Sequence, residues 1–109
     1  MQKAEEKELQ AEIKCNPIYK GKGAMTIRIV NVGNSDALNV RIQILTPEEE
    51  LKGISFLKNE WGPYDMINPQ SAREERLFLC SGHPNTIFVK AIWDDSYKKD
   101  RSVTLAIPL

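Results

Sequence analysis

This chain has little of what catalysis, metal binding or membrane insertion requires. Its 109 residues include one histidine and two cysteines, and fifteen basic residues cancel fifteen acidic ones. Balanced charge removes the usual electrostatic attraction to nucleic acid or to an anionic membrane surface. The sequence has no run of about 18 apolar residues, the length that spans a bilayer. We therefore expect a soluble domain with no nucleic-acid partner and no direct membrane contact.

The few reactive residues do not combine into a recognisable catalytic or metal site. His83 lies in Ser81–Asn85, a segment with the composition of a turn. A dyad of His83 with Cys80 or Ser81 would lack the third group that orients a catalytic base. Cys15, Cys80 and one histidine do not make a four-ligand zinc set. We expect no enzyme activity and no cofactor, and the two cysteines are either bridged or free thiols.

The hydrophobic pattern has a period of two residues. Met25–Val30 and Leu38–Leu45 are alternating runs, and an Asn- and Gly-containing segment separates them. Alternation places apolar side chains on one face of a strand and polar ones on the other. Further strands are predicted from residue 13 and over residues 54–57, 75–80, 86–93 and 100–107. Seven short strands predict an all-β fold, an immunoglobulin-like antiparallel β-sandwich over residues 13–109.

Three other segments have different patterns. Residues 1–12, rich in Ala, Glu, Lys and Gln, are predicted to form a lead-in that is either a short helix or disordered. Thr46-Pro47-Glu48-Glu49 has the residues of a helix start, and Gly53 would end that helix. Residues 59–70 contain a Gly-Pro and an Asn-Pro pair and are predicted to be a loop.

Several segments resemble a known kind of module. The run from Ile27 to Ile42, IRIVNVGNSDALNVRI, resembles bacterial immunoglobulin-like modules of the CARDB-like kind (cell-adhesion-related domains). Ile67–Ser71 and Val89–Asp95 are similar to two later segments of those modules. The charged run Lys3–Glu12 resembles helical stalks of bacterial membrane-anchored proteins. The resemblance implies a β-sandwich placed after a membrane helix and stalk, and it implies no ligand site.

Three aromatic residues, Phe56, Trp61 and Tyr64, lie in or beside the predicted loop. Aromatic side chains in such a loop pack as a lid over an open sandwich edge, anchor a partner protein or stack on sugars. All three alternatives are open, and these residues are the candidates for a protein interface.

Acidic residues near the last predicted hairpin loop are the candidates for a metal site. Asp94, Asp95 and Asp100 could contribute carboxylates to calcium, which binds six to eight oxygen atoms. Lys98 and Lys99 lie among them, and a solvated turn with local Asp–Lys pairs is the alternative. The sequence as a whole favours a non-catalytic protein-interaction or spacer module whose partner is a protein. The alternative is a module that binds a saccharide or calcium.

Overall fold

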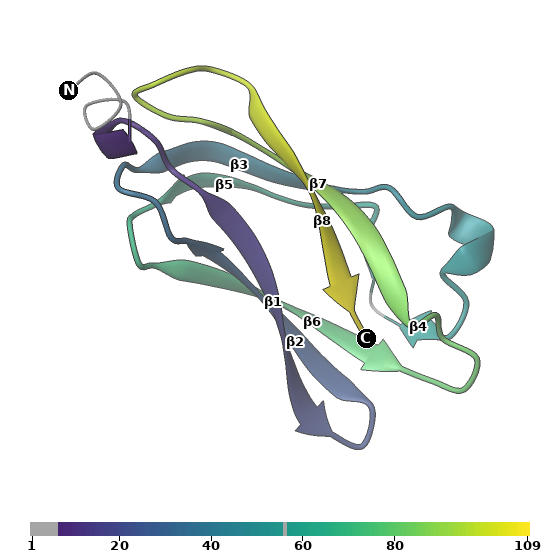
Figure 1. The fold of residues 1–109 in the computed structure, drawn as a ribbon. Helices are drawn as coiled ribbons and strands as arrows, with labels where there is room; N and C mark the ends of the chain where they lie inside the picture. Colours follow the sequence, from purple (N-terminus) through teal and green to yellow (C-terminus); the bar gives the residue numbers. More distant parts are fainter. Residues whose placement is uncertain (1–6, 56) are drawn as a thin grey trace.

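The alternating runs form two four-stranded antiparallel sheets that pack face to face (Figure 1). The computed structural model describes residues 7–55 and 57–109. One sheet has the strand order β1-β2-β6-β4 and the other β5-β3-β7-β8. The strands are β1 (Ile13–Gly21), β2 (Ala24–Asn31), β3 (Ala37–Ile44), β4 (Ile54–Ser55), β5 (Glu60–Ile67), β6 (Ala72–Leu79), β7 (Thr86–Asp94) and β8 (Arg101–Pro108).

The core lies between the sheets and is built from the apolar positions of the period-two pattern. In β2 the side chains of Met25, Ile27 and Ile29 are buried, whereas Arg28 between them is exposed. Strand β7 buries every second residue in the same way, ending at Trp93. Such alternation is expected of sheets with one buried face. The prediction of an all-β fold with two packed sheets is confirmed.

The structure has eight strands and not the predicted seven, because most of residues 59–70 is a strand. This strand, β5, is an edge strand paired with β3. The Gly-Pro pair that favoured a loop lies at a register shift, where Val40 faces Tyr64 and Ile42 faces Trp61. Proline is tolerated at a bulge in an edge strand, because its missing N–H interrupts no inner ladder.

Neither predicted helix is formed as expected. In the described part of the lead-in, Lys7 and Glu8 have helical geometry, but residues 10–12 have no regular secondary structure and no N-terminal helix is present among these residues. The helix expected after Thr46 is only the 3₁₀ turn η1 (Glu48–Glu50), which has no side-chain cap. The Thr46 hydroxyl instead accepts a hydrogen bond from the Phe88 N–H at 2.8 Å. Within the described residues, no helix has the length and apolar character to cross a membrane.

Candidate functional site

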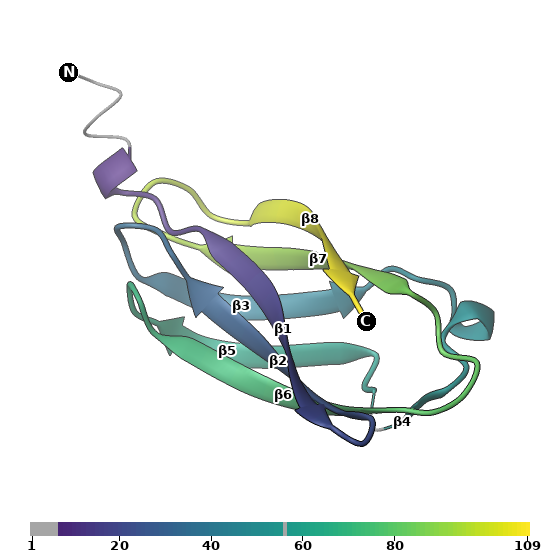
Figure 2. The ribbon, with the colours of Figure 1, turned by 60° about the horizontal axis from the view of Figure 1, so that its bottom comes forward.

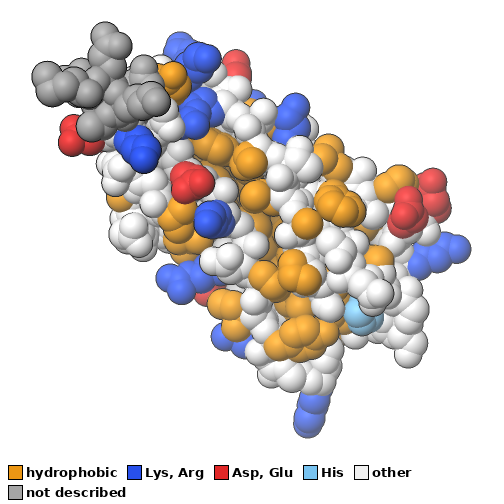
Figure 3. All heavy atoms as spheres, in the orientation of Figure 1, with side chains coloured by type: hydrophobic (Ala, Val, Ile, Leu, Met, Phe, Trp, Pro, Cys, Tyr) orange, Lys and Arg blue, Asp and Glu red, His pale blue; other side chains and the backbone are white. Residues whose placement is uncertain are grey.

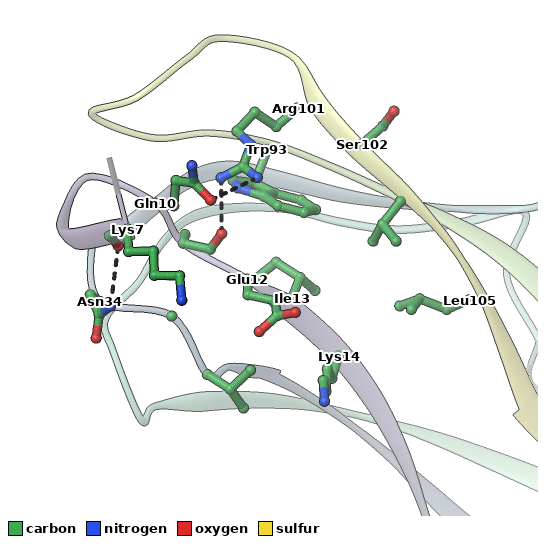
Figure 4. A pocket seen from close by; sticks show the side chains of 14 residues that line it. Lys7, Gln10, Glu12, Ile13, Lys14, Asn34, Trp93, Arg101, Ser102 and Leu105 are labelled. Atoms are coloured by element: carbon green, nitrogen blue, oxygen red, sulfur yellow. Dashed lines mark hydrogen bonds between the residues drawn. The ribbon is translucent and has the colours of Figure 1, made fainter. Parts of the chain in front are cut away.

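Strands β1 and β8 are the edge strands on one side of the sandwich (Figure 2), and a groove lies between them (Figure 4). Its volume is about 540 Å³. Along β8 the inward-facing side chains become more exposed toward the groove, since Ile107 is fully buried, Leu105 is half-buried and Val103 is 36% exposed. Figure 3 shows hydrophobic side chains along the middle of this face. The sandwich therefore presents accessible apolar surface beside an edge strand.

Three of the four sheet edges carry a feature that hinders pairing with another strand. Strand β4 has two residues, β5 has Pro63 and a register shift, and β1 has Pro17 and a register shift before Gly21. Strand β8 pairs with β7 without interruption, has its only proline at Pro108 and carries no charge after Arg101. Among the edges that the described residues form, β8 is therefore the one that carries none of these features, and β1 of the other sheet packs beside it across the groove.

The main-chain groups that β8 leaves unpaired follow from its register with β7. The N–H of Leu109 donates to the carbonyl oxygen of Asn85 at 2.7 Å, and the register from there along β8 is unbroken. In an antiparallel ladder, facing residues alternate between bonded and unbonded pairs. The odd-numbered residues of β8 thus bond to β7. The N–H and C=O groups of Ser102, Thr104 and Ala106 point away from the sheet.

Asp95 lies beneath the end of the groove where the lead-in enters, and its side chain is fully buried. Its carboxylate accepts hydrogen bonds from the Ala11 N–H (2.9 Å), the Trp93 indole (3.2 Å), the Arg101 guanidinium (2.8 Å) and the N–H groups of Tyr97 (3.0 Å) and Lys98 (2.9 Å). Burial raises the pKa of this carboxyl, but the hydrogen bonds outweigh it and the pKa lies below the ordinary value of 3.8.

Arg101 connects Asp95 to the lead-in. Its guanidinium donates to the Ala11 carbonyl oxygen at 3.2 Å and to the Gln10 side-chain oxygen at 3.4 Å (Figure 4). It also lies 5.4 Å from the Trp93 ring centre and 5.5 Å from that of Tyr97, within the range of a cation–π contact. The first residue of β8 therefore holds both the groove wall and the incoming chain in place.

The Asn31-x-Gly33 motif fixes the lead-in from its other side. The Asn31 side chain is fully buried, and its oxygen accepts from the N–H groups of Glu12 at 3.1 Å and Gly33 at 2.9 Å. Its amide nitrogen donates to the carbonyl oxygens of Ser35 and Ile67 at 2.7 and 2.9 Å. A Cβ atom on Gly33 would lie 2.5 Å from the Glu12 nitrogen, so only glycine fits there. In this chain the motif therefore joins the lead-in, the turn after β2 and the end of β5.

Two of the three candidate interface aromatics, Trp61 and Tyr64, lie away from the groove. Trp61 is 1% exposed and packs in the core, so its ring is not displayed to a partner in this structure. Tyr64 is half-buried, and its hydroxyl donates to Glu75, which is also 3.7 Å from the Lys58 ammonium group. Burial and the hydrogen bond to Glu75 raise the pKa of Tyr64. Phe56 lies outside the described residues.

The three acidic residues Asp94, Asp95 and Asp100 have different hydrogen-bond and ion-pair partners. Asp94 accepts a hydrogen bond from the N–H of Asp100 at 2.8 Å, and the Asp100 carboxylate lies 3.4 Å from the Arg41 guanidinium. Asp95 is saturated by the donors already described. Across residues 7–55 and 57–109, no three acidic, cysteine or histidine side chains are grouped as metal ligands.

Cys15 lies on β1, whereas Cys80 and His83 share the turn between β6 and β7, where the His83 N–H donates to the Cys80 carbonyl oxygen at 3.2 Å. Cys15 is a buried free thiol, and burial raises its pKa to about 12. Cys80 is exposed and also free, with its sulfur 3.9 Å from the Ser55 hydroxyl. The His83 Nδ1 atom lies 2.8 Å from the Pro84 carbonyl oxygen in the turn before β7.

Sequence reasoning did not identify Ser102, Thr104 and Ala106, because an edge strand and an inner strand have similar alternating sequences. A usable signal was the absence of proline and charge between Arg101 and Pro108. No known protein family matches the chain, and a search of curated proteins finds no similar sequence.

Proposed function

We propose that this chain is a non-catalytic, immunoglobulin-like module that binds proteins by adding a strand of the partner to β8. The strand orders β1-β2-β6 and β3-β7-β8 support the immunoglobulin-like assignment, since they correspond to strands A-B-E and C-F-G of that fold. The two further edge strands depart from its chain order, because β4, which pairs with β6, precedes β5, which pairs with β3. A CARDB-like module is the kind within that class that the Ile27–Ile42 run favours. The proposed partner is a protein in an extended conformation.

The observation that carries the proposal is the unprotected edge of β8. Pairing with an extended segment would satisfy the outward main-chain groups of Ser102, Thr104 and Ala106, and main-chain hydrogen bonds provide the affinity in this mode of recognition. Edges of this kind are normally blocked by proline, charge or a bulge. The eight-residue edge of β8 lacks these features, so it is the edge to which a partner strand would bind.

The groove beside β8 gives the proposed site its selectivity. Side chains of an added strand point alternately to the two faces of the sheet. Every second side chain would therefore lie over Val103 and Leu105 and toward Ile13 on the opposite wall. These three neighbours are apolar, although Glu12, Lys14 and Arg101 also line the groove. The segment that fits therefore has Val, Leu or Ile at alternate positions and no proline at the positions that donate to β8.

The test is an NMR titration of the chain with extended peptides that alternate Val or Ile with Thr. We expect chemical-shift changes over residues 101–108 and at the groove residues of β1. Thr104→Pro removes a central outward N–H without removing a bond to β7, and should abolish these changes in a folded protein. Thr104→Val keeps that N–H and serves as the matched control. Shift changes confined to other surfaces, or unaltered binding by the T104P variant, would refute strand addition at β8.

A further inference from the structure

We infer that the strand which pairs with β8 is β8 of a second copy of this chain, in a two-fold antiparallel arrangement centred on Thr104. This inference rests on the proposed function, because it names the occupant of the same edge. It requires more than an open edge, since the sequence of β8 must be complementary to itself. Three properties of the strand meet that requirement.

The first property is the match of hydrogen-bonding groups. With the two-fold axis at Thr104, each Thr104 faces the other, and Ser102 of one copy faces Ala106 of the second. Every outward N–H of either copy then meets an outward carbonyl oxygen. An axis one residue further along would place Ser102 opposite Pro108, which has no N–H. That register would leave the carbonyl oxygen of Ser102, within the strand, unpaired in each copy, whereas the Thr104-centred register leaves only that of Pro108 at the strand end.

The second property is the match of side chains on the inner face. In the Thr104-centred register, Val103 of one copy faces Leu105 of the second, and the reverse pair forms on the other side of the axis. Val103 is 36% exposed and Leu105 is half-buried in one copy, so pairing would cover apolar surface that the sandwich leaves open. Apolar pairs directly across an antiparallel ladder are stabilising. On the outer face, Ser102, Thr104 and Ala106 are small enough to stand side by side.

The third property is the absence of charged side chains along the strand itself after Arg101; the charged groove residues Lys7, Glu12 and Lys14 belong to the lead-in and to β1. Between Arg101 and the end of the strand there is no charged residue, and Arg101 itself is paired with Asp95 at 2.8 Å. The whole chain has a formal net charge of zero and an isoelectric point near 6.6. Two copies therefore approach each other at neutral pH without the self-repulsion that keeps highly charged proteins apart.

The test is disulfide trapping of the full chain in a Cys80→Ser background, which removes the exposed native thiol. Directly facing, hydrogen-bonded residues have Cα atoms about 5.5 Å apart, which suits a disulfide. Thr104→Cys should therefore cross-link two copies under mild oxidation. Ser102→Cys is the matched control, because Ser102 faces Ala106 and not itself. Mixing the S102C and A106C variants should restore cross-linking between unlike copies.

The cross-linking rates of these variants show whether two copies pair through β8 in the Thr104-centred register. A covalent dimer that forms at least about tenfold faster for T104C than for S102C, with fast cross-linking in the mixture, supports the inference. Equal rates for all single variants, or no dimer, would overturn it. The peptide titration then separates the two claims. If alternating Val and Thr peptides still perturb residues 101–108, the proposed function stands and only the second copy is wrong.

Discussion

At the scale of single residues, Asp95 is the most highly connected polar side chain of the site. One carboxylate binds the lead-in through the Ala11 N–H, the start of β8 through Arg101 and its own loop through two further amides. Its neighbour Asp94 accepts one hydrogen bond, from Asp100. We therefore expect substitutions of these two adjacent aspartates to change the stability of the fold by different amounts.

We expect Asp95→Asn to lower the free energy of unfolding by about 2–4 kcal/mol, because the side-chain NH₂ would face donors that now bind a carboxylate oxygen. Asp94→Asn keeps its acceptor oxygen and should change stability by less than about 0.5 kcal/mol. Urea denaturation of both variants measures the difference. Equal effects of the two substitutions would contradict the assignment of Asp95 as the central acceptor.

The same carboxylate predicts a pH dependence of stability. Because the pKa of Asp95 is lower in the folded protein than its ordinary value of 3.8, its stabilisation is fully present above that value and is lost as the pH falls. The stability difference between the wild type and the D95N variant should therefore shrink progressively as the pH is lowered from about 5 through 3.8 and below. Denaturation at a series of pH values measures it. A difference that stays constant over this range would show that the charge of Asp95 does not contribute.

Residue roles of this kind were largely hidden in the sequence. Asp95 accepts a hydrogen bond from Ala11 across 84 positions, and no local feature distinguishes it from Asp94. The Asn-x-Gly motif was noticed as a turn signal, but its second function depends on the lead-in returning to the β2–β3 turn. Long-range contacts of buried polar groups are set by tertiary packing, which a pattern of residue types does not encode.

At the scale of elements, the lead-in is part of the sandwich from Gln10 onward. The Gln10 carbonyl oxygen accepts from the N–H groups of Asn34 and Ser35, and the Glu12 carbonyl oxygen accepts from that of Val32 at 2.8 Å. Ala11 between them is 1% exposed. These residues are bound by backbone and side-chain partners on both sheets, although they belong to no strand.

A chain of residues 13–109 should therefore be less stable than one of residues 10–109, by about 2–4 kcal/mol, because several hydrogen bonds are lost and Asp95 loses a donor. Chemical denaturation of the two fragments measures this difference. Equal stability would mean that residues 10–12 only rest on the surface of the sandwich.

Elements with a sustained period of two were predictable, and those interrupted by turn residues were not. Residues 25–30 and 38–45 gave β2 and β3 within one residue or two of the observed bounds. Strand β5 was missed because Gly62 and Pro63 are strong local turn signals, and only its place at a sheet edge explains why a strand tolerates them. The edge position belongs to the topology and not to the segment.

At the scale of the whole molecule, the two-sheet architecture followed from alternation, whereas the groove did not. The groove lies where β1 and β8 end their respective sheets on the same side of the sandwich (Figure 2). Its accessible apolar residues, Val103 and Leu105, are inward-facing positions that would be ordinary core in a more closed sandwich. The proposed interaction site is thus a consequence of sheet geometry.

The central claim is that β8 is bonded on one side and open on the other, and residue-resolved amide hydrogen exchange of the dilute chain tests it most directly. We predict that the N–H groups of Ser102, Thr104 and Ala106 exchange rapidly, because they point away from the sheet. Those of Val103, Leu105 and Ile107 should be protected by about a hundredfold more, because they bond to β7. Uniform protection along β8, or uniformly fast exchange, would contradict the account.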